Sequence, residues 1–136
     1  MTNAPLLRAI DAVTLPVPDL DQGLAYYRDR LGHEMIWRND DLGQSAVRLP
    51  DSKAELVLTT DQNYEPNWLV DSVPQAVATM VSGGGRVIVE ERRIPVGRLA
   101  VVADPFGNPL VLLDLSAGSY VTDRDRHVVG VVPPDH

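Results

Sequence analysis

Apolar residues follow two different periods along this chain, and each period occurs in both halves. Between residues 20 and 31 they recur every three or four positions, which is typical of an amphipathic helix, and this spacing returns from 73 to 80. Short runs with the composition of β-strands surround both segments. The pattern therefore predicts one helix and four strands in each half, in the order βαβββ.

The two halves also match position by position. When the chain is shifted by 53 residues, Val17 falls on Val70 and the apolar positions of the two helical segments coincide. Asp19 and Ser72 are good N-cap residues, and a glutamine three residues after each completes the capping-box pattern. Glycine follows both helical segments, as a helix C-terminus favours. We interpret this as an internal repeat; the alternative is that two amphipathic helices simply look alike.

The repeat predicts a single domain, residues 1–136, that holds two modules and a tail. Module one covers about 8–60, module two covers about 64–116, and 117–136 forms a hairpin-like tail. One βαβββ unit leaves an apolar sheet face that its helix does not cover, so two units can place these faces around a shared cleft. The tail either covers a sheet edge, extends a dimer interface, or is a surface appendage.

Composition narrows the classes of function. Of the 136 residues, 44% are hydrophobic and 23% charged, and none is cysteine, which excludes disulfides and thiolate chemistry. The net charge of -7 argues against a nucleic-acid partner, because phosphate binding needs a basic face. No run approaches the roughly 20 apolar residues that cross a bilayer, and the start lacks a signal-peptide pattern. We therefore expect no membrane partner and a cytoplasmic location.

Two segments carry a resemblance to a known family. "IDAVTLPVPDLDQGLAYYRDRLG" (10–32) and "VADPFGNPLVLLDL" (102–115), with its Asp-Pro-x-Gly-Asn turn, resemble the vicinal oxygen chelate superfamily. That superfamily includes glyoxalase I, bleomycin-resistance proteins and extradiol dioxygenases. The resemblance implies an α+β fold in which two βαβββ modules form a U-shaped, partly open barrel around a cleft. It also implies a homodimer.

The resemblance further implies four positions for the ligands of a divalent metal. They fall here on Ala12, Val57, Glu65 and Val111, so three of the four carry aliphatic side chains. One carboxylate alone does not supply the ligands that zinc, calcium or magnesium needs. We therefore predict no metal-binding residue and no cofactor. A relocated metal site of Glu55 and Glu65 remains an alternative.

Alternation along the strands predicts which side chains line the cleft. The predicted ligand-binding residues are Ala12, Thr14, Trp37, Arg48, Val57, Thr59, Glu65, Asn67, Arg98, Val111 and Leu113. Glu65 is the candidate catalytic residue, because a carboxylate beside apolar walls is suited to accept a proton or to bind a cation. Asp114 has the opposite parity to Val111, so we expect it to meet solvent or a helix terminus. Trp68 has the opposite parity to Glu65 and is expected in the core.

These observations favour a glyoxalase/bleomycin-resistance-like protein without the usual metal ligands. It would bind a small organic molecule in an apolar cleft, as a sequestration or resistance protein does. An alternative is an enzyme of the superfamily, such as a lyase, isomerase or dioxygenase-like protein, that uses Glu65 as base or a relocated metal site. A structural or regulatory dimer with a vestigial cleft is the third possibility.

Overall fold

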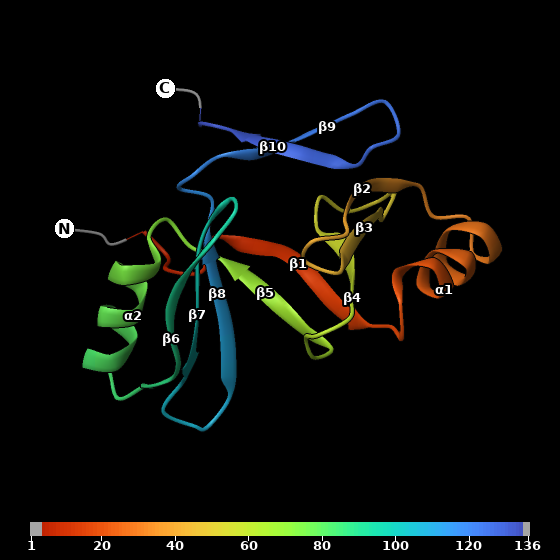
Figure 1. Cartoon of the computed structure of the whole chain (residues 1–136). Coiled ribbons are helices and arrows are strands. Elements are labelled where there is room, and N and C mark those ends of the chain that lie inside the picture. Colours follow the sequence, from red (N-terminus) through yellow and green to blue (C-terminus); the bar gives the residue numbers. More distant parts are fainter. Residues whose placement is uncertain (1–3, 135–136) are drawn as a thin grey trace. The chain divides into compact units, whose positions relative to one another are not determined.

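The structure is a computed structural model that describes residues 4–134, and these residues divide into two compact units (Figure 1). We name each unit after its α-helix. The α1 unit holds residues 11–66 and 120–130, and the α2 unit holds the remaining described residues, chiefly 67–119. Within residues 4–134 no helix has the length and apolar character needed to span a bilayer.

Each half of the chain contains one α-helix and four strands, so the predicted βαβββ order and α+β class are confirmed. The first half comprises β1 (Ala9–Pro16), α1 (Leu20–Leu24), the π-helical η1 (Ala25–Arg30), β2 (Met35–Asn39), β3 (Gln44–Arg48) and β4 (Glu55–Thr59). The second half comprises β5 (Glu65–Leu69), α2 (Val73–Ser82), β6 (Arg86–Ile94), β7 (Gly97–Ala103) and β8 (Pro109–Asp114).

The strands of the α1 unit lie in the order β2-β3-β4-β1, with β1 parallel to β4. The sheet has a different core cluster on each face. Helical residues Leu20 and Leu24 pack on Val47 and Leu58, whereas Ala46 and the cluster around it belong to the other face. This division follows directly from the alternation of side chains along each strand.

Asp19 caps α1 as the sequence predicts. Its Oδ1 accepts a hydrogen bond from the Gln22 N–H at 2.8 Å, and the Gln22 side-chain amide donates back to Asp19. The apolar positions predicted for this helix include Leu31, and this part of the prediction is wrong because Leu31 is 48% exposed. The helix widens into η1, where the Leu31 N–H donates to the carbonyl of Tyr26, five residues back. A wider turn shifts the side chains after it out of the α-helical stripe.

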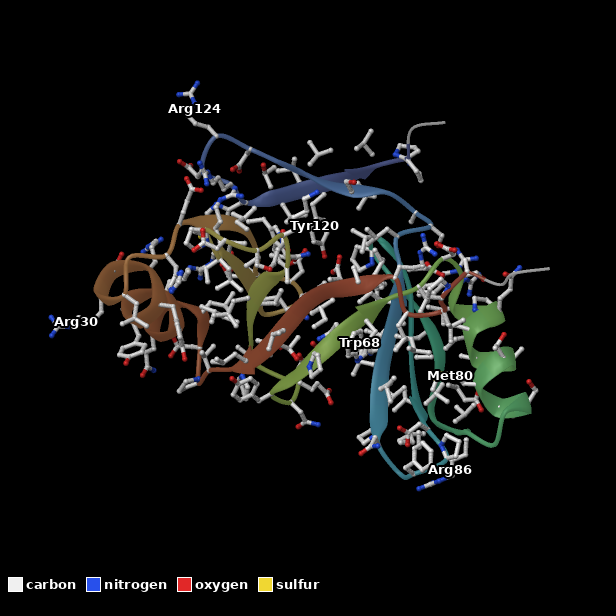
Figure 2. All side chains as sticks on the ribbon, turned by 180° about the vertical axis from the view of Figure 1, so that it is seen from behind. Arg30, Trp68, Met80, Arg86, Tyr120 and Arg124 are labelled. Carbon is white, nitrogen blue, oxygen red and sulfur yellow. The ribbon has the colours of Figure 1, made fainter. Side chains whose placement is uncertain are left out.

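The α2 unit has the strand order β5-β8-β7-β6, with β5 parallel to β8 and α2 beside β6, β7 and β8 (Figure 1). Its core cluster joins Val73 and Ala76 of α2 to the strand residues Ala100, Val102 and Leu112. Trp68 and Met80, both labelled in Figure 2, pack against this cluster, which confirms the core position predicted for Trp68.

The charged segment before β7 belongs to strand β6. Glu91–Ile94 continues β6 and pairs with β7, with Arg93 opposite Arg98 and Ile94 opposite Gly97. Only two residues are left to turn between the strands, so the segment closes a tight hairpin. Glycine is required at Gly97, because a Cβ there would collide with the Asp114 carbonyl oxygen.

The predicted tail hairpin is present as a separate two-stranded sheet of β9 (Ser119–Thr122) and β10 (Val128–Val132). Its turn contacts β2. The Arg38 N–H donates to the Arg126 carbonyl at 2.9 Å, and Arg126 Nη1 donates to the Met35 carbonyl at 2.7 Å. Of the roles left open, covering a sheet edge is the one observed in the α1 unit.

Candidate functional site

The α1 unit has an apolar face on the side of its sheet that α1 does not cover. It consists of the buried residues Ala12, Ala46 and Val57, with Ile36 and Trp37 packed against them. Backbone register places them together, since Ala46 lies opposite both Val57 and Trp37. Ala12 and Val57 therefore share a face, as the alternation argument predicts. We call this set the apolar face.

Glu55 lies at one end of the apolar face. It is the register partner of Ala12 on β1 and of Arg48 on β3, and its parity matches that of Val57. The Trp37 Nε1–H donates to Glu55 Oε1 at 3.1 Å. The carboxylate is half-buried, so β4 positions one acidic group at the border of an aliphatic surface.

Burial raises the pKa of Glu55 above its ordinary value of 4.5. The hydrogen bond from Trp37 lowers this pKa, the negative charge of Asp11 raises it, and the charge of Arg48 lowers it, with burial the largest of these effects. Asp11 is also half-buried, and burial raises its pKa. This part of the α1 unit therefore holds two carboxyl groups whose ionised forms are poorly solvated.

Tyr120 completes the surroundings of Trp37 and comes from the tail hairpin. The two ring centroids are 4.9 Å apart at an interplanar angle of 60°, an edge-to-face arrangement. Figure 2 shows Tyr120 projecting from β9 toward the strands of the α1 unit. Burial raises the pKa of its phenol, a hydrogen bond with Asn39 lowers it, and the charge of Glu55 raises it. Sequence reasoning missed Tyr120, because nothing in the tail indicates where its hairpin lies.

The other predicted residues of the α1 unit have structural partners. The Thr14 hydroxyl donates to the carbonyls of Asn63 and Glu65, at 2.7 and 3.1 Å. The buried Thr59 hydroxyl donates to Asp61 Oδ1 at 3.1 Å. Both hydroxyls thus hold the loop before β5 or the end of β4.

Arg48 lies at the rim of the apolar face and not over it. Its Nε donates to Glu34 Oε1 at 2.8 Å, and its side chain is 54% exposed. Glu65 begins β5, where its carbonyl oxygen accepts the hydrogen bond from Thr14. The catalytic role assigned to Glu65 from the sequence stays a prediction.

In the α2 unit, Asn67, Val111 and Leu113 share one face as predicted. Asn67 pairs in register with Val111, and Leu69 pairs with Leu113, while Trp68 pairs with Leu112 of the core. Asn67, Val111 and Leu113 are all buried. The alternation predicted along β5 and β8 is therefore confirmed within this unit.

Arg98 does not lie on the face predicted for the cleft residues. It lies opposite Asp114 in the β7–β8 register, two residues before Ala100, so its side chain belongs to the face of the α2 core. Its Nη1 is 3.9 Å from Glu91 Oε1, across the β6–β7 hairpin.

Asp114 ends β8 and binds the start of α2, one of the two outcomes expected for it. It is 2% exposed, and its Oδ2 accepts from the Val73 N–H at 2.8 Å. Its Oδ1 accepts from the Arg98 N–H at 3.0 Å, and from the Ser116 N–H and hydroxyl at 3.2 and 2.7 Å. Burial raises the pKa of Asp114, but these hydrogen bonds together lower it below its ordinary value of 3.8.

A hollow of about 330 Å³ lies elsewhere, in the α2 unit. Its lining includes Arg8, Asp71 and Ser116, and none of the residues predicted to bind a ligand. Arg8 Nε is 3.9 Å from Asp71 Oδ1, so the charges at its border are paired with each other. The apolar face, and not this hollow, is where the predicted residues gather in the α1 unit.

The chemistry of the implied metal positions can be stated residue by residue. Ala12, Val57 and Val111 are each 5% exposed and carry no oxygen, nitrogen or sulfur donor in their side chains. Divalent ions in proteins need several such donors. Among residues 4–134, no group of three or more histidine, aspartate and glutamate side chains is placed to hold a metal ion. Three of the four positions that the resemblance implies therefore offer no side-chain donor to a metal ion.

A family model described as Glyoxalase/Bleomycin resistance protein/Dioxygenase superfamily matches residues 9–112. Methylmalonyl-CoA epimerase from Mycobacterium tuberculosis is 22% identical, with a TM-score of 0.65 over 84% of this chain and 92% of that chain. A variant of the Streptomyces coelicolor methylmalonyl-CoA epimerase, in complex with 2-nitronate-propionyl-CoA, is 20% identical, with a TM-score of 0.63 over 82% of this chain and 99% of that chain.

A hypothetical protein from Bacillus halodurans C-125 is 12% identical, with a TM-score of 0.59 over 78% of this chain and 93% of that chain. None of the curated protein sequences compared with the chain matches it. At these identities the structural likenesses establish the fold and leave the chemistry to be argued from the residues.

Proposed function

Because the chain belongs to the Glyoxalase/Bleomycin resistance protein/Dioxygenase superfamily, we propose that it binds a small organic molecule without a metal at the superfamily's ligand positions. One observation carries this proposal. Ala12 and Val57, two of the implied ligand positions, are buried aliphatic side chains that pack in one cluster with Trp37. Small-molecule sites are mostly apolar and contain a few polar groups that fix the orientation of the ligand.

The surroundings of the apolar face support the same function. Trp37 and Tyr120 provide aromatic surface, and Glu55 provides one polar group at its border. A protein that binds a molecule here without converting it lowers the free concentration of that molecule, which is the action of a sequestration or resistance protein. A cytoplasmic homodimer belongs to the proposal on the family resemblance, and light scattering of the full chain measures the oligomeric state.

The test measures metal content and ligand binding on one preparation. Trp68→Phe leaves Trp37 as the sole tryptophan, so its fluorescence reports on the apolar face. We expect no stoichiometric metal, a melting temperature unaffected by EDTA, and saturable fluorescence and thermal shifts with neutral aromatic probes such as tert-butylbenzene. Stoichiometric metal with loss of stability on chelation, or no response to any probe, would overturn the proposal.

A second candidate is an enzyme that uses a carboxylate as general base. The observation in its favour is Glu55, because burial raises its pKa toward the range in which a carboxylate accepts protons well. The epimerase relatives suggest a substrate for the test. Exchange of the α-proton of methylmalonyl-CoA in deuterated water, followed by NMR, would support this candidate if Glu55→Gln abolishes it. The binding proposal expects no exchange by either protein.

A further inference from the structure

The border of the apolar face combines a carboxylate with two aromatic rings. The Trp37 Nε1–H donates to Glu55 Oε1 at 3.1 Å, and the Trp37 ring lies 4.9 Å, centroid to centroid, from the ring of Tyr120. All three side chains are partly exposed and belong to the α1 unit. We call Glu55, Trp37 and Tyr120 the aromatic–carboxylate wall.

One negative and one positive charge act on the Glu55 carboxylate at this wall. The negative charge is that of Asp11, a half-buried residue that precedes Ala12 on β1. The positive charge is that of Arg48, whose Nε donates to Glu34 Oε1 at 2.8 Å; Arg126 Nη1 also lies 3.5 Å from Glu34 Oε2. Within residues 4–134, the Glu55 carboxylate accepts its hydrogen bond from the Trp37 indole. Ionised Glu55 can therefore accept further hydrogen bonds or a counter-charge.

Building on the proposed function, we propose that the aromatic–carboxylate wall selects ligands in which an organic cation is joined to an apolar body. An ammonium group there would meet the ionised carboxylate of Glu55 and the electron-rich faces of Trp37 and Tyr120. The apolar body of the same ligand would lie against Ile36 and Trp37, the partly exposed residues that pack on Ala12 and Val57. Ionising a half-buried carboxylate is unfavourable without a partner, and the cation of the ligand would provide that partner.

The experiment compares three probes of nearly equal size and shape: phenyltrimethylammonium, tert-butylbenzene and benzenesulfonate. Binding is followed at pH 7 by Trp37 fluorescence in the Trp68→Phe background and by thermal shift. We expect the cation to bind at least tenfold more tightly than the neutral probe, and the anion to bind most weakly. The preference for the cation should decline as the pH is lowered through the pKa of Glu55, because the neutral carboxyl group attracts it less.

Two variants that change the net charge equally distinguish the effect of the Glu55 charge at the wall from the effect of the protein's net charge. Glu55→Gln should remove the preference, so that the cation and tert-butylbenzene bind with similar affinity. Glu90→Gln changes an exposed residue of β6 and should keep the preference. Urea unfolding of each variant verifies that it folds.

The outcomes distinguish this inference from the proposed function. Equal affinity for the cation and the neutral probe, or a preference that survives Glu55→Gln, would overturn the inference and leave the binding function standing. If none of the three probes binds, both are overturned. A preference lost equally in Glu55→Gln and Glu90→Gln would show a general effect of net charge and would also overturn the inference.

Discussion

Two acidic side chains, one in each unit, have opposite surroundings. Asp114 in the α2 unit accepts four hydrogen bonds from backbone N–H groups and a hydroxyl, and its pKa is lowered. Glu55 in the α1 unit accepts a hydrogen bond from one indole N–H, and its pKa is raised. Both belong to the last strand of their βαβββ repeat.

The number of donors decides which carboxylate is structural. Hydrogen bonds to the charged form compensate for the water that Asp114 loses, so its ionised state helps to fix the start of α2 beside β7 and β8. Glu55 has fewer hydrogen bonds to compensate for lost water, so its ionised form is less favoured than that of Asp114. A strained or poorly solvated group that the fold retains is a candidate for function, whereas a fully satisfied one is a candidate for stability.

The largest effect is expected from Asp114→Ala. The change leaves the N–H groups of Val73 and Arg98 without their acceptor in a buried place. We expect a loss of about 3 kcal/mol or more in the free energy of unfolding, measured with urea at pH 7. Asp114→Asn should lose less, because its amide oxygen still accepts. A loss below about 1 kcal/mol for the alanine variant would show that Asp114 is not the structural member of the pair.

Trp37→Phe should have an intermediate effect in the α1 unit. It keeps an aromatic ring beside Tyr120 and removes the donor to Glu55, so the ionised carboxylate loses its hydrogen bond. We expect the free energy of unfolding, measured with urea, to fall by about 1 to 2 kcal/mol at pH 7. The loss should be smaller at about pH 4, where more of Glu55 is neutral. Equal losses at the two pH values would mean that packing alone explains the role of Trp37.

Glu55→Gln and Asp114→Asn should respond to pH in opposite directions. The folded pKa of Glu55 lies above its unfolded value, so the stability linked to its proton is present below the unfolded pKa and is lost as the pH rises through the folded pKa. The free energy of unfolding of Glu55→Gln, relative to that of the natural chain, should therefore increase as the pH rises from about 4 to about 7.

For Asp114 the folded pKa is depressed, so its contribution is present above the unfolded pKa and is lost as the pH falls through the folded pKa. The free energy of unfolding of Asp114→Asn should therefore lie furthest below that of the natural chain at about pH 7, and the difference should be smallest at about pH 3. Urea unfolding at these pH values and at about pH 4 measures both variants. Parallel pH profiles for the two variants would contradict the comparison.

The smallest effect is expected at the turn of the tail hairpin. Arg126 has a φ of 65°, in the left-handed region, and its side chain contacts the Met35 carbonyl and Glu34. Arg126→Ala removes these contacts and keeps the backbone conformation, whereas Arg126→Gly relaxes the conformation as well. We expect faster hydrogen exchange in β9 and β10 for the alanine variant, with global stability changed by less than about 1 kcal/mol.

The same variant sharpens the comparison between the units. Loosening the hairpin should alter Trp37 fluorescence through Tyr120 and leave the amide protons of Val73 and Arg98 as protected as before. Increased exchange at those two amides would show that the hairpin supports the α2 unit as well, and that the two carboxylates are not locally independent.

Local patterns in the sequence were sufficient to predict much of this structure. Asp19 and Ser72 cap their helices, and strand alternation correctly placed Ala12 with Val57 and Asn67 with Val111. These features depend on neighbours along the chain or on a period of two residues.

What the sequence did not predict depends on contacts between distant segments. Tyr120 reaches Trp37 because the hairpin turn binds β2, and no local pattern specifies that docking. Trp37 packs against the apolar face, where it was predicted to lie, although the register of β2 shifts between Met35 and Trp37. The face of Arg98 is set by its register with Arg93 and Asp114 on the two neighbouring strands. Glu55 was considered as a metal ligand, and its hydrogen bond to an indole has no signature in the sequence.

The most direct test is a carboxyl-detected NMR titration of the natural chain, with and without phenyltrimethylammonium. We predict that Glu55 titrates above 4.5 and Asp114 below 3.8 in the unliganded protein. Adding the cation should lower the pKa of Glu55 and leave that of Asp114 unchanged. A Glu55 that titrates at or below 4.5, or a cation that shifts both residues equally, would contradict the division of roles between the two carboxylates.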